Sequence, residues 1–374
     1  MRVLLRKLIA QLDSTTRAES TEEIEAVQHL RYRVYVEEKG WDVTENVDHE
    51  RRLLSSPGDT APETDIVYTG TPDAVRGAIR LTTWAPGDLP ESVAQVYGLG
   101  RFRGVEDHVV TRVTAGMMVP ELRGHPTALT ALIAGALRMV VKARQPTLWV
   151  TCCPPGLLAS YLKVGLRPTG GPLVQHRTGV LIPMVGSSTD LAHLWRVRSP
   201  LLPVLAALNA AGTFPQVAPV LPLDMESGES NVLTDPARVL EALRVSPGCT
   251  RLDGGILAWL PPCLVEQIAA ESSVLDVPAG TVLARAGVEQ REAFMVLSGL
   301  LEESRHGLPP VPVWGGDVFG TDGALSLDGR RVTTVRAVTP SRVLILRSSR
   351  LQQALVEVPE LAQAQGNRIL TQQA

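Results

Sequence analysis

The stretch WGGDVFGTDGALSLDGRRVTTVRA, residues 314–337, carries more structural information than any other part of the chain. It reads as a glycine turn, a short helix start, and then an arginine followed by small residues and a strand. The first turn of a helix leaves free N–H groups beside the positive end of its dipole, and both favour an anion. A guanidinium that faces this turn can donate two hydrogen bonds to phosphate oxygens. The stretch therefore predicts an anion site that uses Arg331 rather than its neighbour Arg330.

Two glycine-spaced runs before this stretch, residues 277–287 and 293–299, predict strands of a small antiparallel roll. Together with residues 314–337 they resemble the cyclic-nucleotide-binding domain of kinases, channels and bacterial regulators. The resemblance implies a β-roll (jelly-roll) domain over residues 249–374. It implies nucleotide contacts from Phe319, Gly320, Thr321, Asp322, Gly323, Ala324, Leu325, Arg331, Val332 and Thr333.

Two positions of this motif depart from the family pattern. The family has a glutamate directly after Phe-Gly, and its carboxylate accepts a bond from the ribose 2′-hydroxyl. Here Thr321 and Asp322 follow, so either Asp322 substitutes with a shorter reach or the site is degenerate. Val332 stands where Thr or Ser accompanies a preference for cyclic GMP, and this favours cyclic AMP over cyclic GMP.

The composition of the chain bounds its class. With 374 residues, 44% hydrophobic and 20% charged, we expect a globular protein of about two domains. A net charge of −3 predicts no nucleic-acid partner. The four cysteines show no disulfide framework and no CxxC spacing, which predicts a reducing cytoplasm. The seven histidines show no HxxxH or HxH spacing, which predicts that no metal is bound. The uncharged run 199–223 contains too many prolines for a membrane span. A homodimer is left open.

The first half of the chain shows helical and strand patterns in a regular order. We expect a helix capped by Ser20 or Thr21, two strands, a long strand, a turn that opens a second helix, and then strand, helix and strand. The expected ranges are 20–40, 65–69, 77–84, 109–119, a turn at 120–128 with its helix ending at 144, 147–153, 157–163 and 179–185. This order resembles the GCN5-related acetyltransferase (GNAT) superfamily and implies its α/β (α+β) fold for residues 1–190.

The turn VPELRGHPTA, residues 119–128, is similar to that superfamily's acyl-carrier loop, Arg/Gln-x-x-Gly-x-Gly/Ala. Such a loop wraps a pyrophosphate with backbone N–H groups, and Pro126, which replaces the central glycine, has none. A phosphopantetheine arm has one phosphate and suffers less from this loss. The resemblance therefore implies acyl-CoA or an acyl-carrier protein as the donor. The resemblance implies contacts from Met118, Val119, Arg123, Gly124, His125, Thr127 and Ala128.

Two further motifs support the same superfamily. YLKVGLRP, residues 161–168, resembles its Tyr-x-x-x-Gly-Phe motif, in which the tyrosine protonates the leaving thiolate, and this implies Tyr161 as the acid. RYRVYVEEKGW, residues 31–41, resembles the N-terminal signature of autoinducer synthases and N-acyl amino acid synthases. That signature and a Gly-x-Ile-Arg-Leu strand imply substrate-binding roles for Arg31, Tyr35, Trp41 and Arg80.

The implied chemistry is attack of an amine on an acyl thioester. A base takes the amine proton, and backbone N–H groups near Met117–Val119 stabilise the oxyanion. In the family an acidic segment follows the tryptophan, and here it implies Asp48 or Glu50 as the base.

Three of the residues with an implied functional role also have a purely structural interpretation. Arg31 can be a solvated cation that pairs with Glu37 or Glu38. Trp41 can be a core or lid residue, and Tyr161 can simply pack against the long helix.

The sequence thus predicts an acyltransferase domain at residues 1–190, a helical connector at 191–248 and a nucleotide sensor at 249–374. The function that fits this order is an N-acyltransferase regulated by cyclic nucleotide. A transcription regulator places a helix-turn-helix after the sensor, and the residues after Arg350 are too few for one. The alternative is a non-catalytic cyclic-nucleotide-sensing or scaffold protein with degenerate sites.

Overall fold

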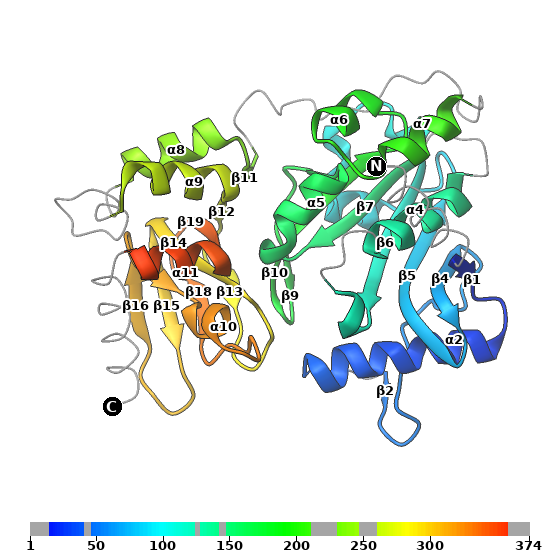
Figure 1. Cartoon of the computed structure of the whole chain (residues 1–374), viewed down its shortest axis with the longest axis horizontal. Coiled ribbons are helices and arrows are strands. Elements are labelled where there is room, and N and C mark those ends of the chain that lie inside the picture. Colours follow the sequence, from blue (N-terminus) through cyan, green and yellow to red (C-terminus); the bar gives the residue numbers. More distant parts are fainter. Residues whose placement is uncertain are drawn as a thin grey trace. The chain divides into compact units, whose positions relative to one another are not determined.

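The computed structural model describes residues 15–40, 46–123, 128–141, 147–210, 230–246 and 260–357. The chain forms two compact units (Figure 1). The N-terminal unit takes in Met1–Cys152, Ser160–Gly171 and Pro183–Gly228. The C-terminal unit takes in Cys153–Ala159, Pro172–Ile182 and Glu229–Ala374. The domain boundaries that the sequence suggests, at residues 190 and 248, stay predictions.

The first described helix, α2 (Thr21–Arg31), begins with a reciprocal cap. Ser20 Oγ accepts from the N–H of Glu23 at 3.2 Å, and a Glu23 carboxylate oxygen accepts from the N–H of Ser20 at 2.9 Å. Two donors at the helix start are thereby satisfied. The helix then widens into a π-helix, Tyr32–Glu38. The helix that the sequence predicts over residues 20–40 is therefore confirmed as far as Glu38, with Ser20 as its cap.

The larger sheet has the order β1-β4-β5-β6-β7-β10-β8, and β9 pairs with β10. Strands β4, β5 and β6 are antiparallel, whereas β6 and β7 are parallel. The sequence predicts the five long strands and misses the short ones. The bounds are Thr15–Arg17 (β1), Thr64–Thr71 (β4), Ala74–Trp84 (β5), Val109–Met118 (β6), Thr147–Cys153 (β7), Arg167–Pro168 (β8), Val174–His176 (β9) and Gly179–Ser187 (β10).

Helices α2 and α4 (Ala128–Val141) cover opposite faces of this sheet. Ile66 and Tyr68 of β4 pack with Leu30 of α2, whereas Val67 between them packs with Leu132 of α4. This follows from the alternation of side chains along a strand. Burying each such aliphatic side chain contributes roughly 1.5–3 kcal/mol, so the two clusters hold the sheet between its helices.

Short elements complete this part of the chain. A hairpin of β2 (Val47–Asp48) and β3 (Leu53–Leu54) follows the first helix. Helix α7 lies in the segment for which the sequence predicts a helical connector. The helices are Glu91–Val96 (α3), Leu158–Val164 (α5), Leu191–Arg196 (α6) and Leu202–Ala210 (α7), with 3-10 turns at Leu99–Arg101, Val105–Asp107, Pro120–Leu122 and Pro155–Leu157.

The C-terminal unit contains two antiparallel sheets, with the orders β11-β12-β19-β14-β17 and β13-β18-β15-β16. Their short strands and glycine turns agree with the antiparallel roll that the sequence predicts. The bounds are Val232–Leu233 (β11), Ser273–Val277 (β12), Val282–Ala284 (β13), Glu292–Ser298 (β14), Leu300–Ser304 (β15), Val311–Trp314 (β16), Val318–Phe319 (β17), Thr334–Ala337 (β18) and Ser341–Arg347 (β19).

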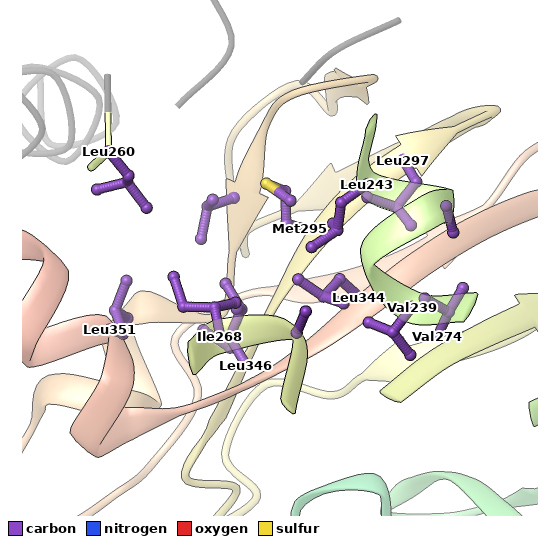
Figure 2. Packing of buried hydrophobic residues seen from close by; sticks show 14 of the residues in the cluster. Val239, Leu243, Leu260, Ile268, Val274, Met295, Leu297, Leu344, Leu346 and Leu351 are labelled. Atoms are coloured by element: carbon purple, nitrogen blue, oxygen red, sulfur yellow. The ribbon is translucent and has the colours of Figure 1, made fainter. Parts of the chain in front are cut away.

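Helices α8 (Pro236–Val245), α9 (Pro262–Glu271) and α11 (Ser348–Glu357) pack on the first of these sheets. Figure 2 shows Leu344 and Leu346 of β19 among side chains from the three helices, including Leu243, Ile268 and Leu351. All five side chains are buried. The core of this unit therefore lies between the helices and the β19 sheet.

Candidate functional site

A buried cluster of three charged side chains lies in the N-terminal unit. Arg31 Nη1 lies 2.6 Å from Asp59 Oδ2, and Arg80 Nη1 lies 3.5 Å from Asp59 Oδ1. The side chains are 1%, 5% and 14% exposed in the order Arg31, Asp59, Arg80. The backbone N–H of Ser56 donates to the same carboxylate at 2.9 Å. Arg31 is thus a buried residue whose partner is Asp59, and its interpretation as a solvated cation is wrong.

Positive charge exceeds negative charge around this cluster. Burial lowers the pKa of Arg80 and the neighbouring Arg31 lowers it further, while Asp59 opposes the shift. Arg112 is another nearby cation, with its guanidinium carbon 5.3 Å from the Trp84 ring. In the described part of the chain, Arg31 Nε, Arg31 Nη2 and Arg112 Nε are buried without a hydrogen-bond partner. Two arginines and one carboxylate leave an excess of buried positive charge, which suits an anionic group.

Tyr35 lies near this cluster, close enough for the charges of Arg31 and Arg80 to act on its phenol. Its hydroxyl donates to the carbonyl oxygen of Gly116 at 3.4 Å. Burial raises the pKa of the Tyr35 phenol, and the charges of Arg31, Arg123 and Arg80 oppose that shift. The fold therefore brings Arg31, Tyr35 and Arg80 together, although they come from a helix, a π-helix and a strand. Trp41 lies outside the described residues.

Strand β6 is irregular where it passes this cluster. Its register with β5 shifts between Ala78 and Arg80, and Ala115 has a positive φ of 49°. Within the described residues, pairing with β7 stops at Arg112↔Val150, while pairing with β5 continues to Met118. The second half of β6 thus parts from its parallel neighbour, and a bulge of this kind exposes backbone groups.

The predicted base residues lie on the β2–β3 hairpin. Asp48 is half-buried, and its carboxylate accepts from the backbone N–H of Arg51 at 2.8 Å. Glu50 is exposed. Neither is the partner of Arg31, because Asp59 takes that place. Asp59 is not predicted from the sequence, where its only signal is an acidic residue in the polar loop before β4.

The predicted carrier loop is described in part. Met118 and Val119 are buried, and the N–H of Val119 donates to the carbonyl of Arg76 at 2.9 Å. That N–H is therefore not available as an oxyanion donor. Arg123 donates from Nε to the Met118 carbonyl at 3.0 Å and forms an ion pair with Glu38. Ala128 is buried at the start of α4. Gly124, His125, Pro126 and Thr127 lie outside the described residues.

Tyr161 lies on α5 and is half-buried. Its carbonyl oxygen accepts from the N–H of Gly165 at 3.3 Å and of Leu166 at 3.1 Å, which closes the helix. Gly165 has a φ of 113°, and a Cβ there would lie 2.3 Å from Leu194 Cδ2. The backbone conformation and the close packing of Leu194 therefore require a glycine four residues after Tyr161, apart from any functional role that the resemblance implies.

The C-terminal unit buries Arg331 completely, with a side-chain exposure of 0%. Its guanidinium donates to the carbonyl oxygens of Gly320 and Glu292, and Nη1 lies 3.4 Å from Asp322 Oδ1. Gly320 has a φ of 77°, and a Cβ there would lie 2.4 Å from Arg331 Nη1. The glycine turn that opens the motif is therefore required by the close approach of Arg331.

The other predicted nucleotide contacts lie on β17, on α10 and directly after Arg331. Thr321, Gly323 and Ala324 are buried in α10 (Thr321–Leu325), whereas Leu325 and Val332 are exposed. Phe319 stacks on Phe294 with 5.0 Å between ring centroids. Thr333 donates to Glu303 Oε1 at 2.7 Å. Of the predicted contacts, Gly320, Asp322 and Gly323 lie directly against Arg331.

Asp322 does not stand free to meet a ribose hydroxyl. Its Oδ2 accepts from the N–H of Val332 at 2.6 Å, and its Oδ1 accepts from the N–H of Gly323 at 2.8 Å. The carboxylate is instead turned towards the arginine. Burial raises the pKa of the neighbouring Glu292, while the charge of Arg331 opposes the shift.

The described residues include no group of three metal-binding side chains. In the same part of the chain, no helix has the length and apolar character needed to cross a membrane.

No family model and no curated protein matches the chain. Solved structures match about a third of it. The sensor domain of the transcriptional regulator DNR from Pseudomonas aeruginosa is 18% identical over 36% of this chain and 91% of that chain, with a TM-score of 0.28. PKAR CBD2 with bound Sp-2Cl-cAMPS is 17% identical over 36% of this chain and 90% of that chain, with a TM-score of 0.31.

A cAMP-binding acyltransferase from Mycobacterium smegmatis also matches, with 21% identity and a TM-score of 0.26. The match covers 32% of this chain and 36% of that chain. This chain thus spans about a third of the length of that acyltransferase. A likeness at such scores carries no argument about activity.

Proposed function

We propose that the chain is an N-acyltransferase that is regulated by a cyclic nucleotide, cyclic AMP rather than cyclic GMP. In this proposal the N-terminal unit has the GNAT-like, autoinducer-synthase-like fold and binds the acyl donor and an amine. The C-terminal unit is the sensor. The proposal rests on the residues of the chain itself and not on its likeness to solved structures.

The observation that carries the proposal is the buried Arg31–Asp59–Arg80 cluster beside the bulged strand β6. Arginine is almost never fully buried unless it is paired with an opposite charge, because desolvating its charge costs several kcal/mol. Here two arginines share one carboxylate, and Tyr35 links the cluster to the carbonyl of Gly116 in the bulge. Burial shifts the pKa of Arg80 and of Tyr35, and ionisable groups with shifted pKa values are typical of a functional site.

The residues of the cluster suit the handling of an amine and a thioester. The amine nitrogen forms a bond to the acyl carbon, the carbon–sulfur bond breaks, and the thiolate takes a proton. Asp59 uses both oxygens on Arg31, Arg80 and Ser56, so we assign the base to Asp48 or Glu50. Tyr161 returns a proton to the thiolate. The exposed backbone of the β6 bulge stabilises the oxyanion.

Regulation follows from the second buried arginine. Arg331 lies inside the turn that begins at Gly320, and an anion that reaches it has to rearrange the bonds of that turn. A ligand that prefers one arrangement shifts the equilibrium between two states of the chain. Cyclic AMP is therefore expected to change the rate of acyl transfer.

The test measures release of free thiol from acyl-CoA and acyl-carrier thioesters of several chain lengths, with a mixture of amines as acceptors. Mass spectrometry of the products then identifies the N-acyl compound. We expect thiol release that depends on an amine and changes with cyclic AMP. Tyr161→Phe should lower kcat by about 10²–10⁴-fold, the usual contribution of a general acid.

Two outcomes contradict separate parts of the proposal. A rate that stays the same at millimolar cyclic AMP rejects the regulatory part alone. Absence of amine-dependent thiol release from every donor rejects acyl transfer and favours the alternative, a non-catalytic sensor or scaffold. Thermal shifts with the same donors separate loss of binding from loss of chemistry.

A further inference from the structure

Three N–H donors converge on the carboxylate of Asp322. The N–H of Val332 donates to Oδ2 at 2.6 Å, the N–H of Gly323 donates to Oδ1 at 2.8 Å, and Arg331 Nη1 lies 3.4 Å from Oδ1. A guanidinium and the amide of the residue after it form a ready site for an anion. The side chain of Asp322 already provides that anion.

The surroundings of Arg331 fix its position. Its guanidinium is held by the carbonyl oxygens of Gly320 and Glu292. A Cβ at Gly320 would lie 2.4 Å from Nη1, and one at Gly323 would lie 3.1 Å from Arg331 Cδ, so the turn wraps the arginine closely. The arginine therefore has little freedom to meet a ligand elsewhere.

Asp322 has more freedom than the arginine. Its side chain is 22% exposed, whereas that of Arg331 is 0% exposed. Rotation of the Asp322 side chain would break its bonds to the N–H of Val332 and to Arg331 Nη1. The other recorded partners of the guanidinium are backbone carbonyl oxygens, so Asp322 is the partner that can turn away from it.

We infer that Asp322 is a built-in competitor for the phosphate of the ligand and sets the affinity and anion selectivity of this pocket. The inference rests on the proposed function, in which this unit binds a cyclic nucleotide. A cyclic phosphodiester carries one negative charge, so it must displace the carboxylate or lie beside a like charge. Both reduce the apparent affinity, since only the fraction of molecules with the carboxylate turned away can bind.

The test compares binding of cyclic AMP and cyclic GMP to the full chain by isothermal titration calorimetry. Asp322→Asn removes the charge and keeps the side-chain shape. Asp328→Asn is the matched control, because Asp328 is exposed, lies in the same segment and bonds to the N–H of Arg330 instead. We expect Asp322→Asn to bind cyclic AMP at least about tenfold more tightly than the wild type, while Asp328→Asn stays unchanged. Arg331→Ala added to Asp322→Asn should abolish the gain.

The results separate the inference from the proposed function. If the wild type binds and Asp322→Asn binds no more tightly, the inference is overturned and the sensor assignment stands. If no variant binds at millimolar nucleotide, the sensor assignment and the inference fall together. Asp322→Ala serves as a second variant should the asparagine protein fail to fold, and the same gain is required of it.

Discussion

Asp59→Asn tests whether the buried cluster holds the N-terminal unit together. The substitution removes the one carboxylate shared by Arg31 and Arg80, whose side chains are 1% and 14% exposed. Two guanidinium groups would then lie close together without a counter-charge. Removing one partner of a buried ion pair costs about 3 to 5 kcal/mol, because the remaining charge stays desolvated. For a unit of this size that corresponds to a melting temperature lower by about 6 to 20 °C.

The assay is differential scanning calorimetry of the full chain, in which the transition of the N-terminal unit is followed. Asp65→Asn is the matched control. Asp65 forms an ion pair with Arg17 at 2.6 Å, the same distance as that between Arg31 and Asp59. The Arg17 side chain is 53% exposed, however, and that of Asp65 is 28% exposed. An exposed pair contributes about 0 to 1 kcal/mol, so the control should shift the melting temperature by a few degrees at most.

Repeating the calorimetry of both variants at high salt tests the same argument in a second way. Added salt screens an exposed pair and hardly affects a buried one. The difference between the two variants should therefore persist at high salt. Equal shifts for Asp59→Asn and Asp65→Asn would refute the reasoning, since burial would then make no difference to the value of the carboxylate.

Two further predictions concern pH and backbone conformation. Burial lowers the pKa of His193 to about 4, and two nearby arginines add to the shift, so its stabilising effect is complete above pH 6.5 and is lost as the pH falls towards 4. His193→Gln should therefore weaken the dependence of the melting temperature on pH across that window, as measured by calorimetry at several pH values. Gly320→Ala should cost about 1 to 3 kcal/mol more than Gly307→Ala in thermal unfolding, because both glycines have a φ of 77° but only Gly320 lies against Arg331. Equal losses for the two glycines would contradict this reason.

The long elements were predictable because their patterns are local. The cap at Ser20 and Glu23 is visible as a spacing of three residues, and the apolar alternation of β4 and β5 shows in single segments. The two-residue strands β2, β3 and β8 could not be predicted in the same way. A strand of that length has no periodicity of its own, and its existence depends on its partner.

The close approach of Arg331 to the Gly320 turn was predictable for a similar reason. Gly320, Asp322 and Arg331 lie within one short stretch, so a single motif contains the arginine and the glycine that makes room for it. What the motif did not show was the direction of the Asp322 carboxylate. That direction depends on the fold of the turn, which brings the N–H of Val332 within 2.6 Å of Asp322 Oδ2.

The partner of Arg31 shows where local reasoning fails. Asp48 lies closer in sequence and matches the family's acidic segment, yet its carboxylate accepts from the N–H of Arg51, three residues further on. A short aspartate in a tight turn satisfies a nearby backbone donor first, because that bond needs no long-range closure. Asp59 lies 28 residues from Arg31, and the fold buries both side chains in the same place. Burial decides the pairing, because a buried guanidinium requires a buried carboxylate. Burial depends on the folded chain, so the spacing of residues in the sequence does not predict it.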